Sequence, residues 1–412
     1  MIGDYPEAAT GEESVVQPIQ LLAPDGTLTE HEVYSAYVNG LSDARLRELY
    51  RYMALERRLD AEATSLQRQG QLALWVPATG QEAAQVGTVA ALRSKDMIFP
   101  TYREHGMALY RGISPAELLV QFRATGHSGW DPATYAFHIY TVVLGAQTLH
   151  AAGWAMGAKA ESRLETLREA AHTASKPSDD AAASQDERAP LDYPTDEVVL
   201  ACLGDGASSQ GDVHESMVFA SSYHLPMIYF IQNNHWAISV PAERQSRTPL
   251  AHRAEGYGFE GVRVDGNDVL ASYAVAAHQA EAIRAGHGPK LIESVTYRMG
   301  AHTTADDPTK YRTADEVASW KAKDPIDRYR SWLVSGDKAD EAFFSEVEEE
   351  GKSLAADLRS SVLSMTSIDL DEVFDTVYTE PHRQVEVEKG WLKDYEAGFV
   401  EEGSAGGEGA TR

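Results

Sequence analysis

Two kinds of hydrophobic pattern alternate in the middle of the chain. Short, unbroken apolar runs at residues 198–203 and 227–231 are typical of strands that are buried on both faces of a sheet. Between these runs Val213, Met217 and Ala220 recur at helical spacing. The sequence therefore predicts a strand, a helix and a second strand in this order.

The same alternation continues toward the C-terminus. Residues 261–266 and 289–297 have strand character, and the alanine-rich stretch 269–285 between them has helical character. Strands that alternate with helices are typical of parallel sheets covered by helices on both faces. We therefore expect an α/β fold with a doubly wound, mostly parallel sheet.

Long amphipathic helices are expected outside this unit. Residues 43–68 carry apolar side chains along one side, and the charged stretch 340–365 has an apolar stripe. We expect helical extensions at both ends of the central domain. The predicted parts are an N-terminal tail or arm (1–40), the α/β domain (41–365) and a C-terminal extension with a disordered end (366–412).

One segment inside the domain has a different composition. Residues 160–196 contain almost no large apolar side chains after Leu167 and are rich in Ala, Ser, Asp and Glu. This composition is typical of a disordered loop. We expect an insertion in a surface connection, whose first residues could extend the preceding helix.

The balance of charges bears on possible partners. The chain of 412 residues has 36 basic and 63 acidic side chains, which gives a formal net charge of −27. Such an excess of negative charge argues against nucleic acid or an acidic membrane surface as partner. The single cysteine, Cys202, excludes an internal disulfide and is consistent with a reducing compartment. No apolar run approaches 18 residues, so we expect a soluble, cytoplasmic protein.

Polar residues follow directly after the first two predicted strands. Gly204-Asp205-Gly206 ends the first strand, and Asn233-Asn234 ends the second about 30 residues later. Because parallel strands end at the same edge of a sheet, Asp205 and Asn234 should face one crevice. Their oxygens suit Mg²⁺, and the helix start after Gly206 offers N–H groups to an anion such as a diphosphate. Either motif alone would be explained as a turn; the pair favours a metal and diphosphate site.

These motifs resemble those of a known enzyme family. GDG followed about 30 residues later by NN is the motif of thiamin-diphosphate enzymes. GDGASSQGD and QNNHWAIS are similar to the α subunit of E1, the decarboxylating component of 2-oxo acid dehydrogenase complexes. The resemblance extends over residues 40–400 with an interruption at 160–196. It implies the thiamin-diphosphate-binding fold, with thiamin diphosphate and Mg²⁺ as cofactors.

The resemblance also implies which residues bind the metal and the diphosphate. Asp205, Asn234 and the main-chain carbonyl of Trp236 would bind Mg²⁺. Gly206 and Ala207 would contact the diphosphate. The cofactor site would therefore include Asp205, Gly206, Ala207 and Asn234, whereas Trp236 would contact only the metal.

A Tyr-Arg pair forms a further candidate contact with the diphosphate. The planar fork of donors in Arg103 suits a diphosphate, although an arginine in a loop could equally pair with Glu104. Family members hold the diphosphate with a Tyr-Arg pair at this place, which implies that Tyr102 and Arg103 bind the cofactor. Gln232 stands where relatives often have an arginine, so one contact with the phosphate would be missing.

Histidines supply the candidates for catalysis. In the polar loop after the last predicted strand, His302 matches the family's active-site histidine and Arg298 a nearby arginine that contacts the cofactor. The family has another active-site histidine upstream, for which His127 and His138 are both candidates. Leu144 would line the pocket around the cofactor pyrimidine.

The resemblance implies an α subunit of an E1 component. Such an enzyme decarboxylates a 2-oxo acid and transfers the acyl group to the lipoyl group of E2. In this family the glutamate that activates the cofactor belongs to a separate β subunit, and no second cofactor-binding half is apparent in this sequence. We therefore expect an α₂β₂ heterotetramer with an E1 β subunit, acting on the lipoyl domain of the E2 acyltransferase.

The sequence leaves the substrate open between pyruvate and a branched-chain 2-oxo acid of the 2-oxoisovalerate type. Residues 262–269 look like branched-chain enzymes, whereas residues 232–245 look like pyruvate enzymes. An acetoin dehydrogenase α subunit and a non-catalytic subunit on the same fold are the alternatives. A nucleotide-binding dehydrogenase is disfavoured because Ser209 takes the place of the third glycine in G-x-G-x-x-G.

Overall fold

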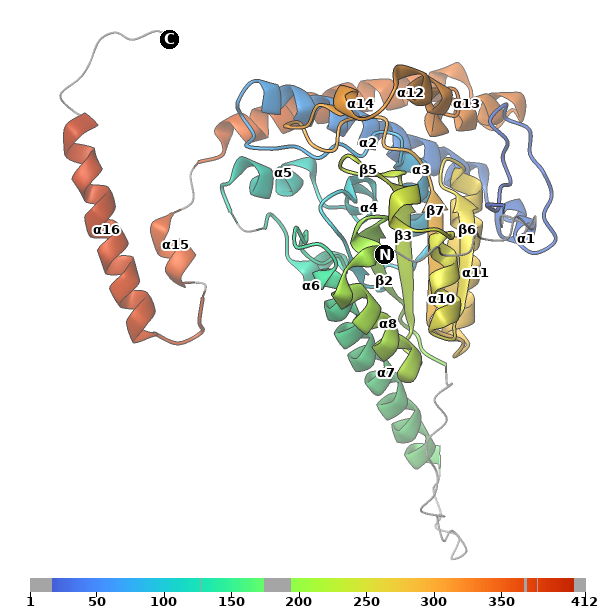
Figure 1. Cartoon of the computed structure of the whole chain (residues 1–412), viewed down its shortest axis with the longest axis horizontal. Coiled ribbons are helices and arrows are strands. Elements are labelled where there is room, and N and C mark those ends of the chain that lie inside the picture. Colours follow the sequence, from blue (N-terminus) through green and yellow to red (C-terminus); the bar gives the residue numbers. More distant parts are fainter. Residues whose placement is uncertain (1–16, 127, 174–193, 367–368, 376, 404–412) are drawn as a thin grey trace, which may run out of the picture.

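A five-stranded parallel sheet lies at the centre of the computed structural model, which describes residues 17–126, 128–173, 194–366, 369–375 and 377–403 (Figure 1). The strand order is β1–β2–β3–β7–β6, and every neighbouring pair is parallel. The strands are β1 (Ile98–Phe99), β2 (Val199–Gly204), β3 (Met227–Asn233), β6 (Glu260–Asp265) and β7 (Lys290–Val295). A small antiparallel hairpin consists of β4 (Trp236–Ala237) and β5 (Val240–Pro241). The predicted α/β fold with a mostly parallel sheet is confirmed.

The central strands are apolar throughout because both of their faces are buried. In β2, Leu200 and Cys202 belong to one hydrophobic core, whereas Val199, Ala201 and Leu203 belong to a second core on the opposite face. All five side chains are fully buried. This explains why the strand has no alternation of polar and apolar residues.

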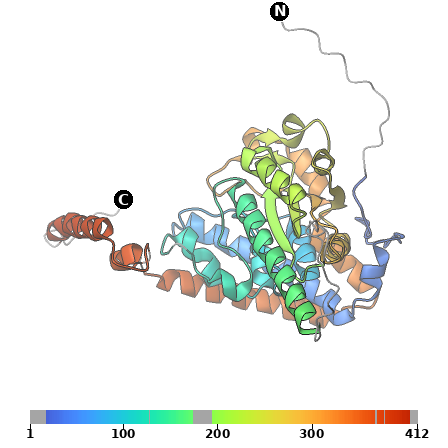
Figure 2. The same ribbon diagram turned by 90° about the horizontal axis from the view of Figure 1, so that it is seen from below.

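Helices cover both faces of the sheet, as the doubly wound prediction required (Figures 1 and 2). Residues of the first core come from α1 (Ser35–Asn39), α2 (Asp43–Arg68), α3 (Glu82–Ala91), α4 (His105–Tyr110), α5 (Pro115–Arg123), α11 (Val269–Arg284), α13 (Pro325–Ser335) and α14 (Glu341–Ser364). The second core is built with α7 (Ala146–Thr173), α8 (Gly211–Ser222) and α10 (Arg253–Gly256). The short helices α6 (Pro132–Tyr135), α9 (Ala242–Gln245) and α12 (Ala314–Lys321) lie in connections.

The N-terminal arm is attached to the edge of the sheet. Ile19 forms main-chain hydrogen bonds with Arg263 and Asp265 on β6, each 2.9 Å long. The main-chain N–H groups of Leu21 and Leu22 donate to one carboxylate oxygen of the buried Asp268, at 2.7 and 2.6 Å. The described part of the arm is therefore packed onto the domain.

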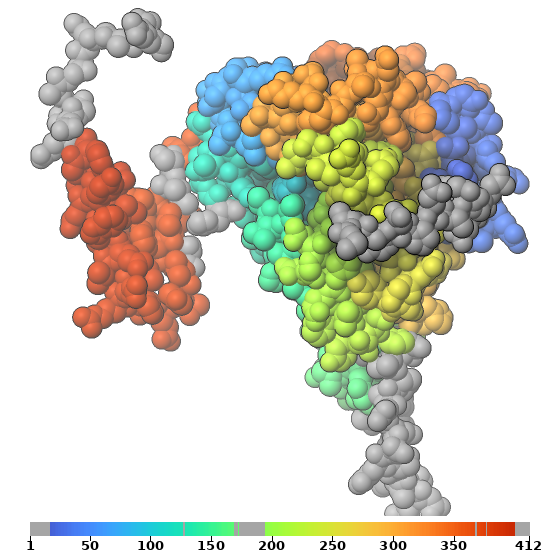
Figure 3. All heavy atoms as spheres, in the orientation of Figure 1, coloured from blue at the N-terminus to red at the C-terminus, as the bar shows by residue number. Residues whose placement is uncertain are grey.

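The C-terminal extension contains two helices, α15 (Leu370–Asp375) and α16 (Arg383–Gly403). They contact each other, and α16 stands apart from the body of the molecule in all three views (Figure 3). The predicted disordered end falls mainly on residues 404–412, which lie outside the described residues. No helix of the described chain is both long and apolar enough to cross a membrane.

The insertion predicted at 160–196 begins as ordered structure. Helix α7 continues to Thr173, so residues 160–173 are helical rather than disordered. Leu164 and Leu167 on this part of α7 are exposed, which explains why the sequence lacks the apolar stripe of a buried helix. Residues 174–193 lie outside the described residues.

The close approach of α3 to α11 depends on a glycine and gives a test of the packing. An added Cβ at Gly87 would lie 2.6 Å from the carbonyl oxygen of Val269 and 2.7 Å from Cβ of Ser272. We expect Gly87→Ala to lower the free energy of unfolding by about 1–3 kcal/mol because the two helices must separate. Gly153→Ala is the matched control, since a Cβ at this exposed helical position meets nothing within 4 Å. It should leave stability unchanged or raise it by up to about 1 kcal/mol. Equal thermal stability of both variants would contradict this packing.

Candidate active site

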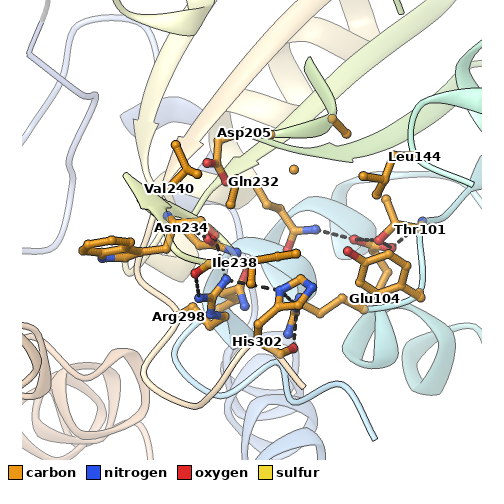
Figure 4. Close-up of a pocket in the computed structure, with 18 of the residues that line it drawn as sticks. Thr101, Glu104, Leu144, Asp205, Gln232, Asn234, Ile238, Val240, Arg298 and His302 are labelled. Atoms are coloured by element: carbon orange, nitrogen blue, oxygen red, sulfur yellow. Dashed lines mark hydrogen bonds between the residues drawn. The ribbon is translucent and has the colours of Figure 1, made fainter. Parts of the chain in front are cut away.

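A pocket of about 270 Å³ opens at the carboxyl edge of the sheet (Figure 4). Asp205 follows β2 and Asn234 follows β3, while Arg298 lies in the connection after β7. The predicted crevice between the ends of neighbouring strands therefore exists, and all three side chains line it. The loops after β1 and β7 add Arg103 and His302 to the lining.

The loop after β2 is shaped for close contact with the β4–β5 hairpin. An added Cβ on Gly206 would lie 2.6 Å from Cβ of Ala237, so only glycine permits this approach. Asp205, Gly206 and Ala207 all line the pocket, and a short 3-10 helix (Ala207–Ser209) begins at the last of them. The backbone of this loop is thus exposed to a ligand at the point where helical structure starts.

Three oxygen donors in the pocket fit a hard divalent cation. The carboxylate of Asp205 is 3% exposed, and its burial raises the pKa of Asp205 to about 6. Asn234 contributes an amide oxygen, and the Trp236 carbonyl already accepts a hydrogen bond from Arg298 at 2.6 Å. Carboxylate, amide and carbonyl oxygens are the ligands that Mg²⁺ prefers, and a bound cation would compensate the buried carboxylate.

Two buried guanidinium groups meet at His302. Nη2 of Arg103 lies 3.2 Å from Nδ1 of His302 and donates to the His302 carbonyl at 3.0 Å. Nη1 of Arg298 lies 3.3 Å from the same Nδ1. Because a guanidinium can only donate, Nδ1 must accept, and the proton of the neutral ring is on Nε2.

The two arginines leave positive charge without a carboxylate partner. Arg103 and Arg298 are 5% and 1% exposed, and neither forms an ion pair within the described part of the chain. Burial lowers the pKa of Arg103 to about 10 and also lowers that of Arg298. Nε of Arg298 is buried and has no hydrogen-bond partner among the described residues. Buried charges are normally paired, so this pocket fits an anionic ligand such as a diphosphate.

The surroundings of His302 predict an unusual dependence of stability on pH. Burial, and then the charges of Arg103 and Arg298, lower the pKa of His302 to about 3. In the unfolded chain the pKa of His302 returns to about 6.5. The contribution of the neutral His302 ring to the free energy of unfolding is therefore lost as the pH falls from about 6.5 toward 3. Without cofactor, the free energy of unfolding of the wild type should drop between pH 7 and pH 5. In His302→Gln this drop should be smaller by up to about 2 kcal/mol. Urea unfolding at both pH values measures this; equal drops would contradict it.

The structure brings most of the other predicted residues to the same pocket. Tyr102, Leu144 and Trp236 line it together with the residues described above. His138 does not line it: its ring stacks on Phe99 with a centroid separation of 4.9 Å. The sequence could not exclude His138 because its loop gives no periodic pattern. His127 lies outside the described residues.

Two glutamines that contact the proposed metal ligands were not among the predicted site residues. Gln245 on α9 donates to a carboxylate oxygen of Asp205 at 3.0 Å, and the buried Gln81 accepts from Asn234 at 3.1 Å. The only signal for Gln81 in the sequence was its position at the start of a predicted helix. This position is compatible with the strand-end pocket but does not specify it. Gln232, noted for the missing arginine, donates to Glu104 at 2.5 Å.

Comparison with known proteins gives a consistent result. The family described as "Dehydrogenase E1 component" matches residues 50–359 of the chain. The 3-methyl-2-oxobutanoate dehydrogenase subunit alpha of Mycobacterium tuberculosis (strain ATCC 25618 / H37Rv) is 46% identical over 366 residues, which cover 89% of this chain and 90% of the relative.

More distant relatives carry a different substrate in their names. The pyruvate dehydrogenase E1 component subunit alpha of Staphylococcus epidermidis (strain ATCC 12228 / FDA PCI 1200) is 35% identical over 343 residues, or 83% of each chain. The corresponding subunit of Staphylococcus aureus (strain COL) is 34% identical over 352 residues, or 85% of each chain.

Proposed function

Because this chain belongs to the dehydrogenase E1 component family, we propose that it is the α subunit of the E1 component of a 2-oxo acid dehydrogenase complex. The reaction is the oxidative decarboxylation of a 2-oxo acid, with transfer of the acyl group to the lipoyl group of E2. The observation that carries the proposal is the convergence of Arg103 and Arg298 on His302 beside the three oxygen donors. This combination suits a diphosphate that is bound partly through a metal ion.

Thiamin diphosphate, when bound, supplies a nucleophilic carbon and an electron sink for the loss of carbon dioxide. Asp205, Asn234 and the Trp236 carbonyl would hold Mg²⁺. The chain would bind the diphosphate through Arg103, Tyr102 and the main chain at Gly206 and Ala207, the site of the 3-10 helix start. Leu144 would pack beside the pyrimidine, and Arg298 would orient the ligand next to His302.

His302 would act as a hydrogen-bond donor of fixed orientation. Its Nδ1 is occupied by the two guanidinium groups, which leaves Nε2–H for a ligand. The lowered pKa keeps the ring neutral at physiological pH. A neutral donor of fixed orientation suits the positioning of a substrate carboxylate or of the incoming lipoyl group.

Exposed apolar side chains at the mouth of the pocket are an argument for a partner subunit at this surface. Val142, Val143, Leu144, Ile238 and Val240 are all exposed, and three of them, Leu144, Ile238 and Val240, also line the pocket. Adjacent exposed apolar residues are typical of protein interfaces. The E1 β subunit would cover this rim in an α₂β₂ assembly that then receives the lipoyl domain of E2.

Co-expression with the E1 β subunit of the same genome tests this function. Decarboxylation is measured with an artificial electron acceptor, thiamin diphosphate and Mg²⁺, using 3-methyl-2-oxobutanoate and pyruvate in parallel. We expect turnover that requires both chains. The 46% identity to the branched-chain relative favours at least about a tenfold higher kcat/KM for 3-methyl-2-oxobutanoate. A complex that binds the cofactor but cleaves only acetoin, or that binds no cofactor, would contradict the proposal.

A further inference from the structure

The connection into α3 places a buried glutamine against the predicted metal site. Gly80 has φ +98°, and an added Cβ would lie 2.3 Å from the carbonyl oxygen of Tyr297, so any other residue would push the connection away. Thr296 further fixes it by donating to the Gly80 carbonyl at 2.9 Å. The next residue, Gln81, is fully buried, lines the pocket and lies next to Asn234.

A sequence of hydrogen bonds sets the orientation of both amide groups. The main-chain N–H of Trp236 donates to Oδ1 of Asn234 at 3.3 Å. Because a main-chain N–H can only donate, it fixes which end of the Asn234 amide is the oxygen. Nδ2 of Asn234 then points the other way and donates to Oε1 of Gln81 at 3.1 Å.

Gln81 has no evident structural reason to be a glutamine. It occupies the N-cap position of α3, yet its side chain makes no capping hydrogen bond. Its Nε2 is buried without a partner among the described residues, which costs stability. The hydrogen bond to Asn234 is therefore the interaction that distinguishes this side chain from an apolar one of the same size.

From this geometry we infer that Gln81 is a positioning residue, which holds the amide of Asn234 so that its oxygen faces the bound cation. The inference rests on the proposed function. A carbonyl oxygen has two lone pairs, so Oδ1 of Asn234 can accept from Trp236 and bind a metal ion at once. Without Gln81, Nδ2 would be a buried donor with no acceptor, and the side chain would rotate away from this orientation.

Metal binding to the α₂β₂ complex tests the role of Gln81. Mn²⁺ serves as the probe, because its binding at saturating thiamin diphosphate is measured directly by electron paramagnetic resonance. We expect Gln81→Met, which keeps the size but removes the acceptor, to raise the Kd for Mn²⁺ by about 10–100-fold. Gln81→Ala is measured in parallel, so the result does not depend on one replacement, and thermal unfolding checks that each complex is assembled.

A double substitution separates positioning from a general effect on the fold. Asn234→Ser retains an oxygen but removes the amide, so Gln81→Met should raise the Kd by less than about threefold in that background. The inference is overturned if Gln81→Met leaves the Kd within threefold of the wild type, or if its effect is undiminished beside Asn234→Ser. Failure of the wild-type complex to bind Mn²⁺ with thiamin diphosphate would instead overturn the proposed function.

Discussion

Asp205→Ala is expected to abolish the decarboxylation of 2-oxo acids by the complex. The carboxylate of Asp205 is the only acidic group among the three proposed metal ligands, and its alanine variant leaves two neutral oxygens. We expect a loss of at least about a thousandfold in kcat/KM, which corresponds to about 4 kcal/mol of transition-state stabilisation. The affinity for thiamin diphosphate in the presence of Mg²⁺ should fall with it, and calorimetric titration measures this separately.

The stability of the same variant distinguishes a functional role from a structural one. A buried carboxyl whose pKa is raised from 3.8 to about 6 weakens folding at pH 7 by up to about 3 kcal/mol. Asp205→Ala should therefore be as stable as the wild type, or more stable, when no cofactor is present. The control is Asp212→Ala, an exposed acidic residue on the neighbouring α8, which should change neither activity nor affinity. An Asp205→Ala variant that retains activity would contradict the metal site.

Arg103→Met is expected to weaken the binding of thiamin diphosphate by about 10–100-fold. Arg103 brings a buried positive charge to the pocket, and a hydrogen bond to a charged group contributes about 1.5–3 kcal/mol. Arg103→Lys keeps the charge but loses the planar fork, so its affinity should fall between those of the wild type and the methionine variant. Isothermal titration of the α₂β₂ complex gives the three dissociation constants.

A structural arginine provides the matched control for Arg103. Arg111 also donates to main-chain carbonyls, those of Ser94 and Asp96, but does not line the pocket. Arg111→Met should leave the affinity for thiamin diphosphate unchanged. In the absence of cofactor, Arg103→Met should not lose stability relative to Arg111→Met, because Arg103 is the more deeply buried of two charges that form no ion pair within the described residues. Equal affinities of the two variants would show that Arg103 does not bind the diphosphate.

The sequence was most informative where burial imposes a repeating pattern. The apolar runs after Val198 and after Pro226 correspond to β2 and β3 within about two residues. The placement of Asp205 and Asn234 followed from one physical rule, because parallel strands end at the same edge. Both residues indeed line one pocket.

Contacts that depend on three-dimensional proximity left no such signal. The hydrogen bond from Asn234 to Gln81 joins residues that are 153 positions apart in the sequence. Neither the spacing of motifs nor the composition of the chain reveals it. For the same reason the sequence offered no basis for a choice between His127 and His138; in the structure His138 stacks on Phe99 and does not line the pocket. The sequence allowed the segment after residue 160 to extend the preceding helix but did not show how far, because an exposed helix needs no apolar stripe.

A crystal structure of the α₂β₂ complex with thiamin diphosphate and Mn²⁺ tests the cofactor site most directly. The anomalous scattering of manganese locates the metal independently of any assumption about its ligands. We predict one metal peak per α chain, within bonding distance of Asp205, Asn234 and the Trp236 carbonyl, and diphosphate density in contact with Arg103. A metal peak away from these three residues, or cofactor density elsewhere in the complex, would contradict the assignment.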